Sequence, residues 1–354
     1  MADIRIINCH IHTFTEQHIP RYYPHPLLWL FKKIPGLVRL LAFLFRLIGQ
    51  EGLADTLDRL CRFQQEAGAR TQADVLGRIM PQYPDNTRFV VLPMQMAGLG
   101  HGPVREGLRA QHDELARLAV DPRYQGRVIP FATCDPRLPG AADEVARCIE
   151  DLGFRGLKLY PRIGFDPDHP VLMNDVYPLI EARGLPVLSH CSRGGISGKG
   201  LVPAVADLYS GPEAYIPVMR AFPDLRVNLA HFGGTHDWQA YTQEGLYPGD
   251  PAAGAANWQS MIRHMITSGD WPNLWTDISY TLFRFDDFVP FLRVFLQDAR
   301  LARRVLFGSD FYMTRQEALS ERAVCFRLRV ALGEDLFRQI AETNPEIWLG
   351  ERTG

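Results

Sequence analysis

The sequence lacks a cysteine pattern typical of a disulfide framework or a zinc finger. Its six cysteines are scattered along the chain, and no two of them form a C-x-x-C pair. This distribution is more typical of proteins from a reducing compartment than of small secreted domains. Residues 1–9 also lack the basic start and the long apolar core of a signal peptide. We therefore expect a cytoplasmic protein.

An excess of charge of one sign is also missing. The chain has 38 Lys or Arg and 40 Asp or Glu, for a formal net charge of -2. General nucleic-acid binders normally carry a basic excess, so nucleic acid is not the expected partner. A local basic pocket for a small anionic substrate remains compatible with this balance.

No linker, internal repeat or low-complexity tract divides the 354 residues. With 46% hydrophobic residues the chain can bury a large core, and its length suits one α/β barrel with insertions. We therefore expect a single domain over residues 1–354.

No segment has the roughly 20 mostly uncharged apolar residues that a membrane-spanning helix needs. The strongest candidate, residues 27–48, is interrupted by Lys32, Lys33, Pro35, Arg39 and Arg46. It lies within residues 13–87, which we interpret as a helical insertion. Three roles are open for it: packing on the barrel or in the subunit interface of a homo-oligomer, an active-site lid, and an amphipathic surface that touches a membrane.

Short β-like runs alternate with helix-like segments along the chain. Eight runs have strand character, namely residues 4–10, 88–95, 128–135, 156–161, 186–191, 226–231, 274–279 and 305–310. Alternating β and α units favour a parallel sheet. The count predicts a (β/α)₈ TIM barrel, distorted, with the helical insertion after the first strand.

Two histidines, His10 and His12, stand at the end of the first predicted strand. Strand alternation would turn Asn8, His10 and His12 toward the barrel axis, and the odd-numbered residues 7–11 toward the helices. Two adjacent imidazoles suit a metal such as Zn²⁺. Taken alone, the pair is explained equally well by exposed or structural histidines.

Three further polar residues end predicted strands: His190, His231 and Asp310. In a barrel these ends share one rim, where active sites are built. A lone histidine there is usually satisfied by a hydrogen bond, and a lone aspartate can cap the next helix. Beside the histidine pair they gain another role, because a carboxylate can bind an ion and accept a proton from its water.

Lys158 lies between two leucines of the fourth predicted strand, so alternation points it into the barrel. A buried cationic Lys is costly unless it is paired or neutralised. Three interpretations are open: a neutral or salt-bridged structural Lys, a carbamate that bridges two metals, and a direct contact with an anionic substrate.

Cations also occur in the loops after the predicted strands. Arg162 follows the fourth strand, and Arg193 belongs to a glycine-rich loop, residues 192–200, after the fifth. His236 follows the sixth strand. We predict that these three residues bind the substrate, with Arg193 gripping a carboxylate; the alternative for the loop is a flexible, solvated segment.

The order of the strand-end residues along the chain, from the histidine pair through Lys158, His190 and His231 to Asp310, resembles the pattern of the amidohydrolase superfamily and its amidohydrolase-2 branch. The similarity extends over nearly the whole chain, fades over residues 13–87, and is carried by Asn-Cys-His-Ile-His (8–12), Gly-Phe-Arg-Gly-Leu-Lys-Leu-Tyr-Pro (153–161), Val-Leu-Ser-His (187–190), Leu-Ala-His-Phe-Gly-Gly (229–234) and Phe-Gly-Ser-Asp (307–310). The branch implies a divalent metal, commonly zinc, whereas the donor types also suit manganese, iron or cobalt.

The resemblance also implies roles for single residues. A primary metal would be held by His10, His12, His190 and Asp310. His231 would bind a second metal, or act on the substrate in a one-metal enzyme. Lys158 aligns with the carbamylated Lys of two-metal members such as dihydroorotases. Many members of the branch use one metal, so the metal count, one or two, stays open, with a slight preference for two.

The expected activity is hydrolysis of a C–N or C–O bond in an amide, lactam, lactone or ester of a small organic substrate. Asp310 and His231 are the expected catalytic residues. The alternative is a decarboxylase or hydratase acting on an aromatic-derived acid, in which His231 is the general acid or base and Lys158 bridges no metals. A catalytically inactive scaffold is a third class, against which the complete ligand set argues.

Overall fold

A computed structural model describes residues 4–23, 35–124, 126–244, 257–279, 284–312 and 320–352. Residues 27–34, the first part of the apolar segment 27–48, lie outside these ranges. Within them, the strands are short and follow the order expected from the sequence. They are β1 (Ile7–Ile11), β2 (Arg88–Val91), β3 (Val128–Pro130), β4 (Ala132–Thr133), β5 (Leu157–Leu159), β6 (Val187–Ser189), β7 (Val227–Leu229), β8 (Leu274–Asp277) and β9 (Val305–Leu306).

Every strand pairs in parallel with the next, in two runs, β1-β2-β3 and β4 to β9. Only Phe131 separates β3 from β4, so both belong to one predicted strand; its backbone N–H donates to the Val91 carbonyl at 3.2 Å. Each of the eight predicted runs thus contains or overlaps observed strand structure.

The last strand segment returns to the first. The Cys9 N–H donates to the Phe307 carbonyl at 2.9 Å, and the Asp310 N–H donates to the His10 carbonyl at 2.8 Å. A parallel bridge joins Ile11 and Phe311. The described strands therefore form a closed ring, and the predicted distorted (β/α)₈ barrel is confirmed.

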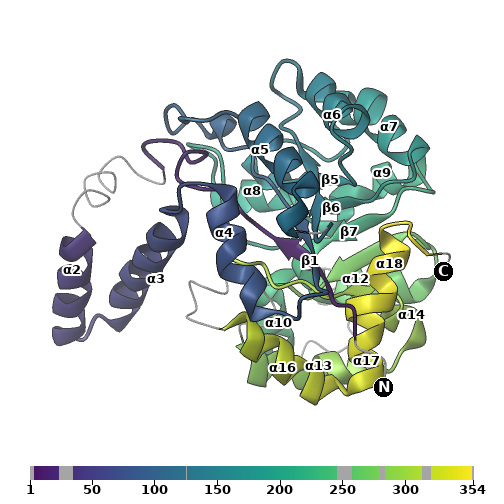
Figure 1. Cartoon of the computed structure of the whole chain (residues 1–354). Helices are drawn as coiled ribbons and strands as arrows, with labels where there is room; N and C mark the ends of the chain where they lie inside the picture. The colour runs from purple at the N-terminus through teal and green to yellow at the C-terminus, as the bar shows by residue number, and fades with distance from the viewer. Residues whose placement is uncertain are drawn as a thin grey trace.

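Helices surround this ring (Figure 1). They are α4 (Gln72–Ile79), α5 (Leu108–Val120), α6 (Ala141–Glu150), α7 (Tyr177–Ala182), α8 (Pro203–Tyr209), α9 (Ile216–Ala221), α10 (Gly234–Glu244), α12 (Trp258–Ser268), α13 (Phe285–Phe295), α14 (Ala299–Ala302), α16 (Glu321–Leu332), α17 (Glu334–Arg338) and α18 (Asn344–Trp348). Their apolar faces and the outward side chains of the strands form one large core.

A second, smaller core fills the inside of the ring. It contains Leu188, Trp275 and Leu306 from the strands together with Trp348 from α18. Arg226, which directly precedes β7, donates to the Trp348 carbonyl at 2.7 Å, so α18 lies at the amino ends of the strands. The polar residues lie at the opposite rim, which is formed by the carboxyl ends of the strands.

The side-chain alternation predicted for β1 is wrong at three positions, residues 7 to 9, and right for His10 and Ile11. Ile7 and Cys9 pack in the inner core, whereas Asn8 faces outward and donates to Tyr83 and Ser309 at 3.0 and 2.9 Å. The pairing of β1 with β2 shifts register between Asn8 and Ile11. Such an irregularity changes the direction of the side chains that follow it. The side chains of Cys9 and His10 can therefore both point into the barrel, although the two residues are consecutive.

The described part of the predicted insertion contains a helical hairpin, α2 (Pro35–Leu47) and α3 (Glu51–Ala67). The two helices pack on each other through buried small side chains such as Val38, Ala42 and Ala54. In Figure 1 the pair projects away from the barrel, with α2 outermost. Within the described ranges, each helix is too short or too polar to cross a bilayer.

Candidate metal centre

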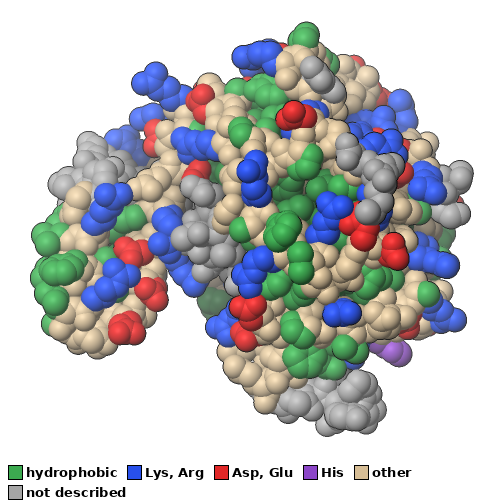
Figure 2. Space-filling view, turned by 60° about the horizontal axis from the view of Figure 1, so that its bottom comes forward, with side chains coloured by type: hydrophobic (Ala, Val, Ile, Leu, Met, Phe, Trp, Pro, Cys, Tyr) green, Lys and Arg blue, Asp and Glu red, His purple; other side chains and the backbone are tan. Residues whose placement is uncertain are grey.

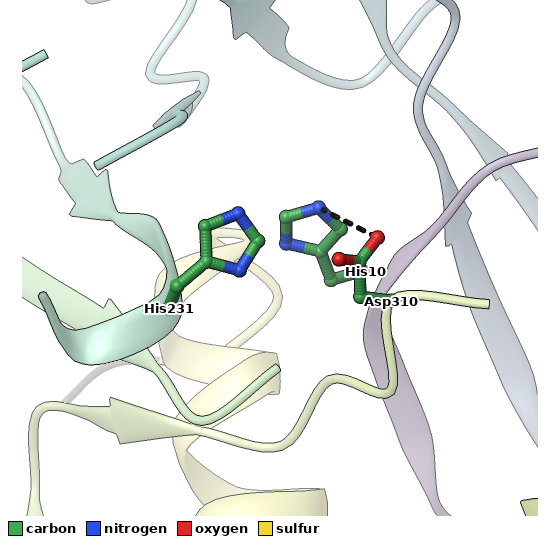
Figure 3. Close-up of side chains that lie close together, drawn as sticks. All are labelled: His10, His231 and Asp310. Carbon is green, nitrogen blue, oxygen red and sulfur yellow. Dashed lines mark ion pairs between the residues drawn. The ribbon is translucent and has the colours of Figure 1, made fainter. Parts of the chain in front are cut away.

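The carboxyl rim of the barrel brings the predicted metal-binding residues together. His10 lies in β1, and His12 directly follows it. His231 lies in a short 3₁₀ turn (Ala230–Phe232) after β7, and Asp310 follows β9. One ligand atom each from His10, His231 and Asp310 lies within 4.8 Å of the others (Figure 3). Residues far apart in the sequence thus form one buried polar cluster.

His10 and His12 both face the carboxylate of Asp310. Their Nε2 atoms lie 3.8 and 3.5 Å from Asp310 Oδ1. His12 Nδ1 bonds to the Leu92 carbonyl at 2.8 Å, so Nδ1 carries the proton and Nε2 presents its lone pair. Burial lowers the pKa of His10 to about 4, helped by the charge of Lys158, and it also lowers the pKa of His12. Both rings are therefore neutral at pH 7, as a metal ligand must be.

His190 and His231 form a second pair across the site. His190 Nδ1 lies 3.1 Å from His231 Nε2. The His190 ring stacks on Tyr160 with the ring centroids 4.1 Å apart, and its Nε2 faces Ser192 Oγ at 3.2 Å. Burial lowers the pKa of both histidines. Nδ1 of His190 is therefore the atom of this residue that faces the other site histidines.

Two of the site residues have unusual backbone conformations. His231 has a φ of 68° and Asp310 a φ of 51°, in the left-handed region that side chains other than glycine seldom adopt. His231 lies two residues after β7, and Asp310 lies four residues after β9. Backbone strain of this kind is concentrated at functional sites, where it aims a side chain that a relaxed chain would direct elsewhere.

A buried carboxylate, Asp277 at the end of β8, supports the histidines from behind. It accepts hydrogen bonds from His10 Nδ1 at 3.2 Å, from Asn228 Nδ2 at 3.0 Å and from the His231 N–H at 3.1 Å. Ser279 also donates to it. Burial favours a raised pKa for Asp277, but its contacts with His10, His231 and Ser279 lower the pKa overall. Sequence reasoning missed Asp277, although its place at a strand end beside histidine-bearing strands was a usable signal.

Lys158 lies inside the barrel, as predicted from its position between leucines. It pairs in register with Leu188, a residue of the inner core. The side chain is 1% exposed, and its Nζ has no hydrogen-bond partner among the described residues. Burial lowers the pKa of Lys158, although Asp277 and Asp310 favour its charged form. The buried amine therefore loses its proton more easily than the amine of an exposed lysine does.

The three predicted substrate-binding residues have different surroundings. Arg162 is buried, pairs with Asp207 at 2.8 Å, and donates to the Gly195 carbonyl of the glycine-rich loop at 2.8 Å. Arg193 pairs with Asp237 at 2.9 Å. The side chain of His236 is 69% exposed and lies 3.4 Å from the same carboxylate. Substrate contact by these residues stays a prediction.

Several properties of the cluster fit a divalent metal ion. His10 Nε2 is buried without a hydrogen-bond partner among the described residues, although it points toward Asp310. Burial raises the pKa of Asp310, because a carboxylate charge is unfavourable in this enclosed place. A cation bound between these atoms would satisfy the nitrogen and stabilise the charge. Imidazole nitrogens with one carboxylate oxygen are a donor set that zinc and other divalent transition metals accept.

The fold and this cluster define a (β/α)₈ barrel with a candidate metal centre at its carboxyl rim, and comparison with known proteins identifies the family. The amidohydrolase family model matches residues 7–350. The chain therefore belongs to the amidohydrolase family, as the sequence motifs predicted. Among curated proteins, none matches it significantly.

Solved structures with the same fold are distant in sequence. An uncharacterised TIM-barrel protein from Bordetella bronchiseptica is 19% identical, with 98% of each chain covered and a TM-score of 0.53. A probable 2-pyrone-4,6-dicarboxylic acid hydrolase from Acinetobacter baumannii is 12% identical, with 98% of this chain and 100% of the other covered and a TM-score of 0.55. The 5-carboxyvanillate decarboxylase from Sphingomonas paucimobilis is 16% identical, with 98% and 99% covered and a TM-score of 0.55. At these identities the similarity shows the fold alone.

Proposed function

We propose that the protein is a metal-dependent hydrolase that cleaves an amide, lactam, lactone or ester bond in a small carboxylated substrate. The observation that carries this proposal is Lys158, whose buried amine lies close enough to the histidines and Asp310 to act on their pKa values and has no hydrogen-bond partner among the described residues. A neutral amine reacts with CO₂ to give a carbamate. That group would supply the oxygen ligands that a second divalent ion needs.

His10, His12, His190 and Asp310 would hold the primary ion, and His231 with modified Lys158 would complete a second position. With a metal held by these residues, the site would supply an acidified water molecule and a polarised scissile carbonyl. Oδ1 of Asp310 faces His10 and His12, so Oδ2 is the atom left to accept the water proton. Asp310 then passes this proton to the leaving group.

Arginines beside the rim support a carboxylated substrate. Arg162 lies close enough to His190 for its charge to lower the histidine pKa, after burial and the charges of His231 and Lys158. Arg193 lies over the Trp258 ring at 4.3 Å, at the start of α12. A carboxylate held by such guanidinium groups would fix the orientation of the substrate.

A decarboxylase is the second candidate function, because one of the proteins with the same fold is a decarboxylase. These proteins include 5-carboxyvanillate decarboxylase as well as a probable hydrolase of 2-pyrone-4,6-dicarboxylic acid. Both of those proteins act on carboxylated ring compounds. In the decarboxylase alternative, His231 would deliver a proton to the ring carbon, and Lys158 would stay an amine.

Metal content, the state of Lys158 and the reaction products together separate the two functions. The protein would be loaded with zinc in ¹³C-bicarbonate, and the metal per chain and the ¹³C carbamate resonance would be measured. Two ions, a carbamate signal that Lys158→Ala abolishes, and hydrolysis of carboxylated lactones or amides are the expected results. One ion, no carbamate and release of CO₂ from carboxylated aromatic acids would replace the hydrolase by the decarboxylase.

A further inference from the structure

The outer helix of the α2–α3 hairpin has an apolar face that nothing in the described chain covers. Five large hydrophobic side chains on or beside α2 are between 46% and 69% exposed, namely Leu40, Phe43, Leu44, Leu47 and Ile48. Residues 40, 43, 44 and 47 follow helical spacing, so they form one stripe. The opposite side of α2 packs against α3 through the buried side chains of Val38 and Ala42. The stripe is therefore a continuous surface.

This stripe lies at the outer edge of the molecule. Figure 1 shows α2 as the outermost helix, with α3 between it and the barrel. In Figure 2 hydrophobic side chains gather along the outer edge of the protruding lobe, and acidic side chains lie on the part nearer the barrel. A planar surface can thus reach the stripe without meeting the barrel.

The charged side chains of α2 itself are basic, whereas the neighbouring α3 carries residues of both signs, among them Asp55 and Asp58. From residue 17 to residue 50 the sequence contains no Asp or Glu and five cations, Arg21, Lys32, Lys33, Arg39 and Arg46. The two lysines lie outside the described residues. Within α2 the charged side chains are Arg39 and Arg46, and the partners of Arg46 are Asp55 and Asp58 of α3, at 3.3 and 2.5 Å.

We propose that α2 docks on an anionic lipid surface, with the Leu40–Phe43–Leu44–Leu47 stripe among the acyl chains and Arg39 and Arg46 at the headgroups. Leucine and phenylalanine with flanking Lys or Arg are the composition of helices that lie in a membrane interface. A second copy of the chain fits less well, because a symmetric contact through this face would bring its cations against their own copies. This role is independent of the reaction at the metal centre.

Vesicle binding of the full chain tests the proposal. Co-sedimentation would use phosphatidylcholine vesicles with and without 30% phosphatidylserine, about a third of the lipid being anionic. We expect binding to the anionic vesicles that weakens in high salt. The double variant Phe43→Ser/Leu47→Ser should bind at least about tenfold more weakly, since two large apolar side chains no longer leave water.

A matched control exists on α16. Phe326 and Val330 have the same spacing of four residues and are both 68% exposed. Phe326→Ser/Val330→Ser should leave vesicle binding unchanged. If both double variants lose binding equally, or if the unmodified chain does not bind anionic vesicles, the proposal is wrong.

A labelled variant reports the docking face directly. All six cysteines of the chain are buried, so Leu47→Cys can be labelled selectively with an environment-sensitive dye. On anionic vesicles its emission should shift to shorter wavelength and be quenched by acyl-chain quenchers, whereas a dye at Val330→Cys should not respond. A dimer in solution that Phe43→Ser/Leu47→Ser dissociates, without any vesicle binding, would overturn the lipid proposal in favour of self-association.

Discussion

Single residues of the metal centre are held in protonation states that suit a cation. The histidines are neutral because burial lowers their pKa values, and Asp310 is held in a left-handed conformation at the rim. Asp277 fixes the His10 tautomer by accepting its Nδ1 proton at 3.2 Å. The site is therefore organised before any ion binds.

Asp310→Asn tests the proton transfer. Asparagine keeps the shape and tolerates a φ of 51°, but its neutral amide accepts no proton and binds metal weakly. We expect kcat/KM to fall by about a thousandfold or more, with the circular dichroism spectrum unchanged. Activity within tenfold of the parent would remove Asp310 from the mechanism.

Asp277→Asn tests positioning without touching the reacting atoms. The amide cannot satisfy His10 Nδ1, Asn228 and the His231 N–H as the carboxylate does. We expect zinc affinity to fall by about 10- to 100-fold in competition with a fluorescent chelator. Asp85→Asn, in an exposed turn, is the control. Equal affinities of the two variants would contradict the role of Asp277.

The sequence predicted those site residues that end strands, because a strand fixes both the position and the direction of a side chain. Lys158 was placed correctly since leucines flank it in β5. Asp277 was missed because an aspartate at a strand end, two residues before a serine, is also typical of a turn. Asn8 was misplaced because the register shift in β1 depends on pairing with β2, which is not encoded locally.

At the scale of elements, the strands were predictable and their irregularities were not. Eight runs of apolar residues gave the ring, but the break at Phe131 and the shift in β1 arise from packing between strands. Contacts between neighbouring helices could not be predicted from the sequence either. One of them joins α5 and α6, where His112 Nδ1 bonds to Glu144 at 2.8 Å while His112 Nε2 accepts the Thr133 N–H at 3.3 Å.

This α5–α6 contact predicts a dependence of stability on pH. Burial lowers the pKa of His112 in the folded protein, so the unfolded chain binds the proton more readily as the pH falls below about 6.5. Burial would raise the pKa of Glu144, but His112 and Arg147 lower it to about 2, so its contribution is lost only below about pH 4.5. We expect Tm to fall from pH 7 to pH 5, and to fall less in His112→Gln. An equal fall in both proteins would contradict this.

At the scale of the whole molecule, the candidate metal centre links distant parts of the chain. Its residues come from the ends of β1, β6, β7 and β9 and from within β5. A bound ion would therefore stabilise the entire ring and not one element. The α2–α3 hairpin supplies neither a strand of this ring nor a candidate ligand, which agrees with a separate role at a surface.

Metal removal should lower the stability of the whole domain. A ligand that binds only the folded state stabilises it by about 2.7 kcal/mol at 100 times its Kd. We expect a chelator to lower Tm by several degrees and zinc to restore it, with one cooperative transition in both states. An unchanged Tm in protein shown by elemental analysis to have lost its metal would contradict a structural contribution of the ion.

The closure of the ring has a consequence for how the protein matures. The Asp310 N–H donates to the His10 carbonyl, so the same two residues close the barrel and face each other as candidate ligands. A growing chain exposes His10 and His12 long before Asp310 is synthesised. The complete set of candidate donors would then exist only after translation has passed β9, and an early-terminated chain would carry an incomplete set.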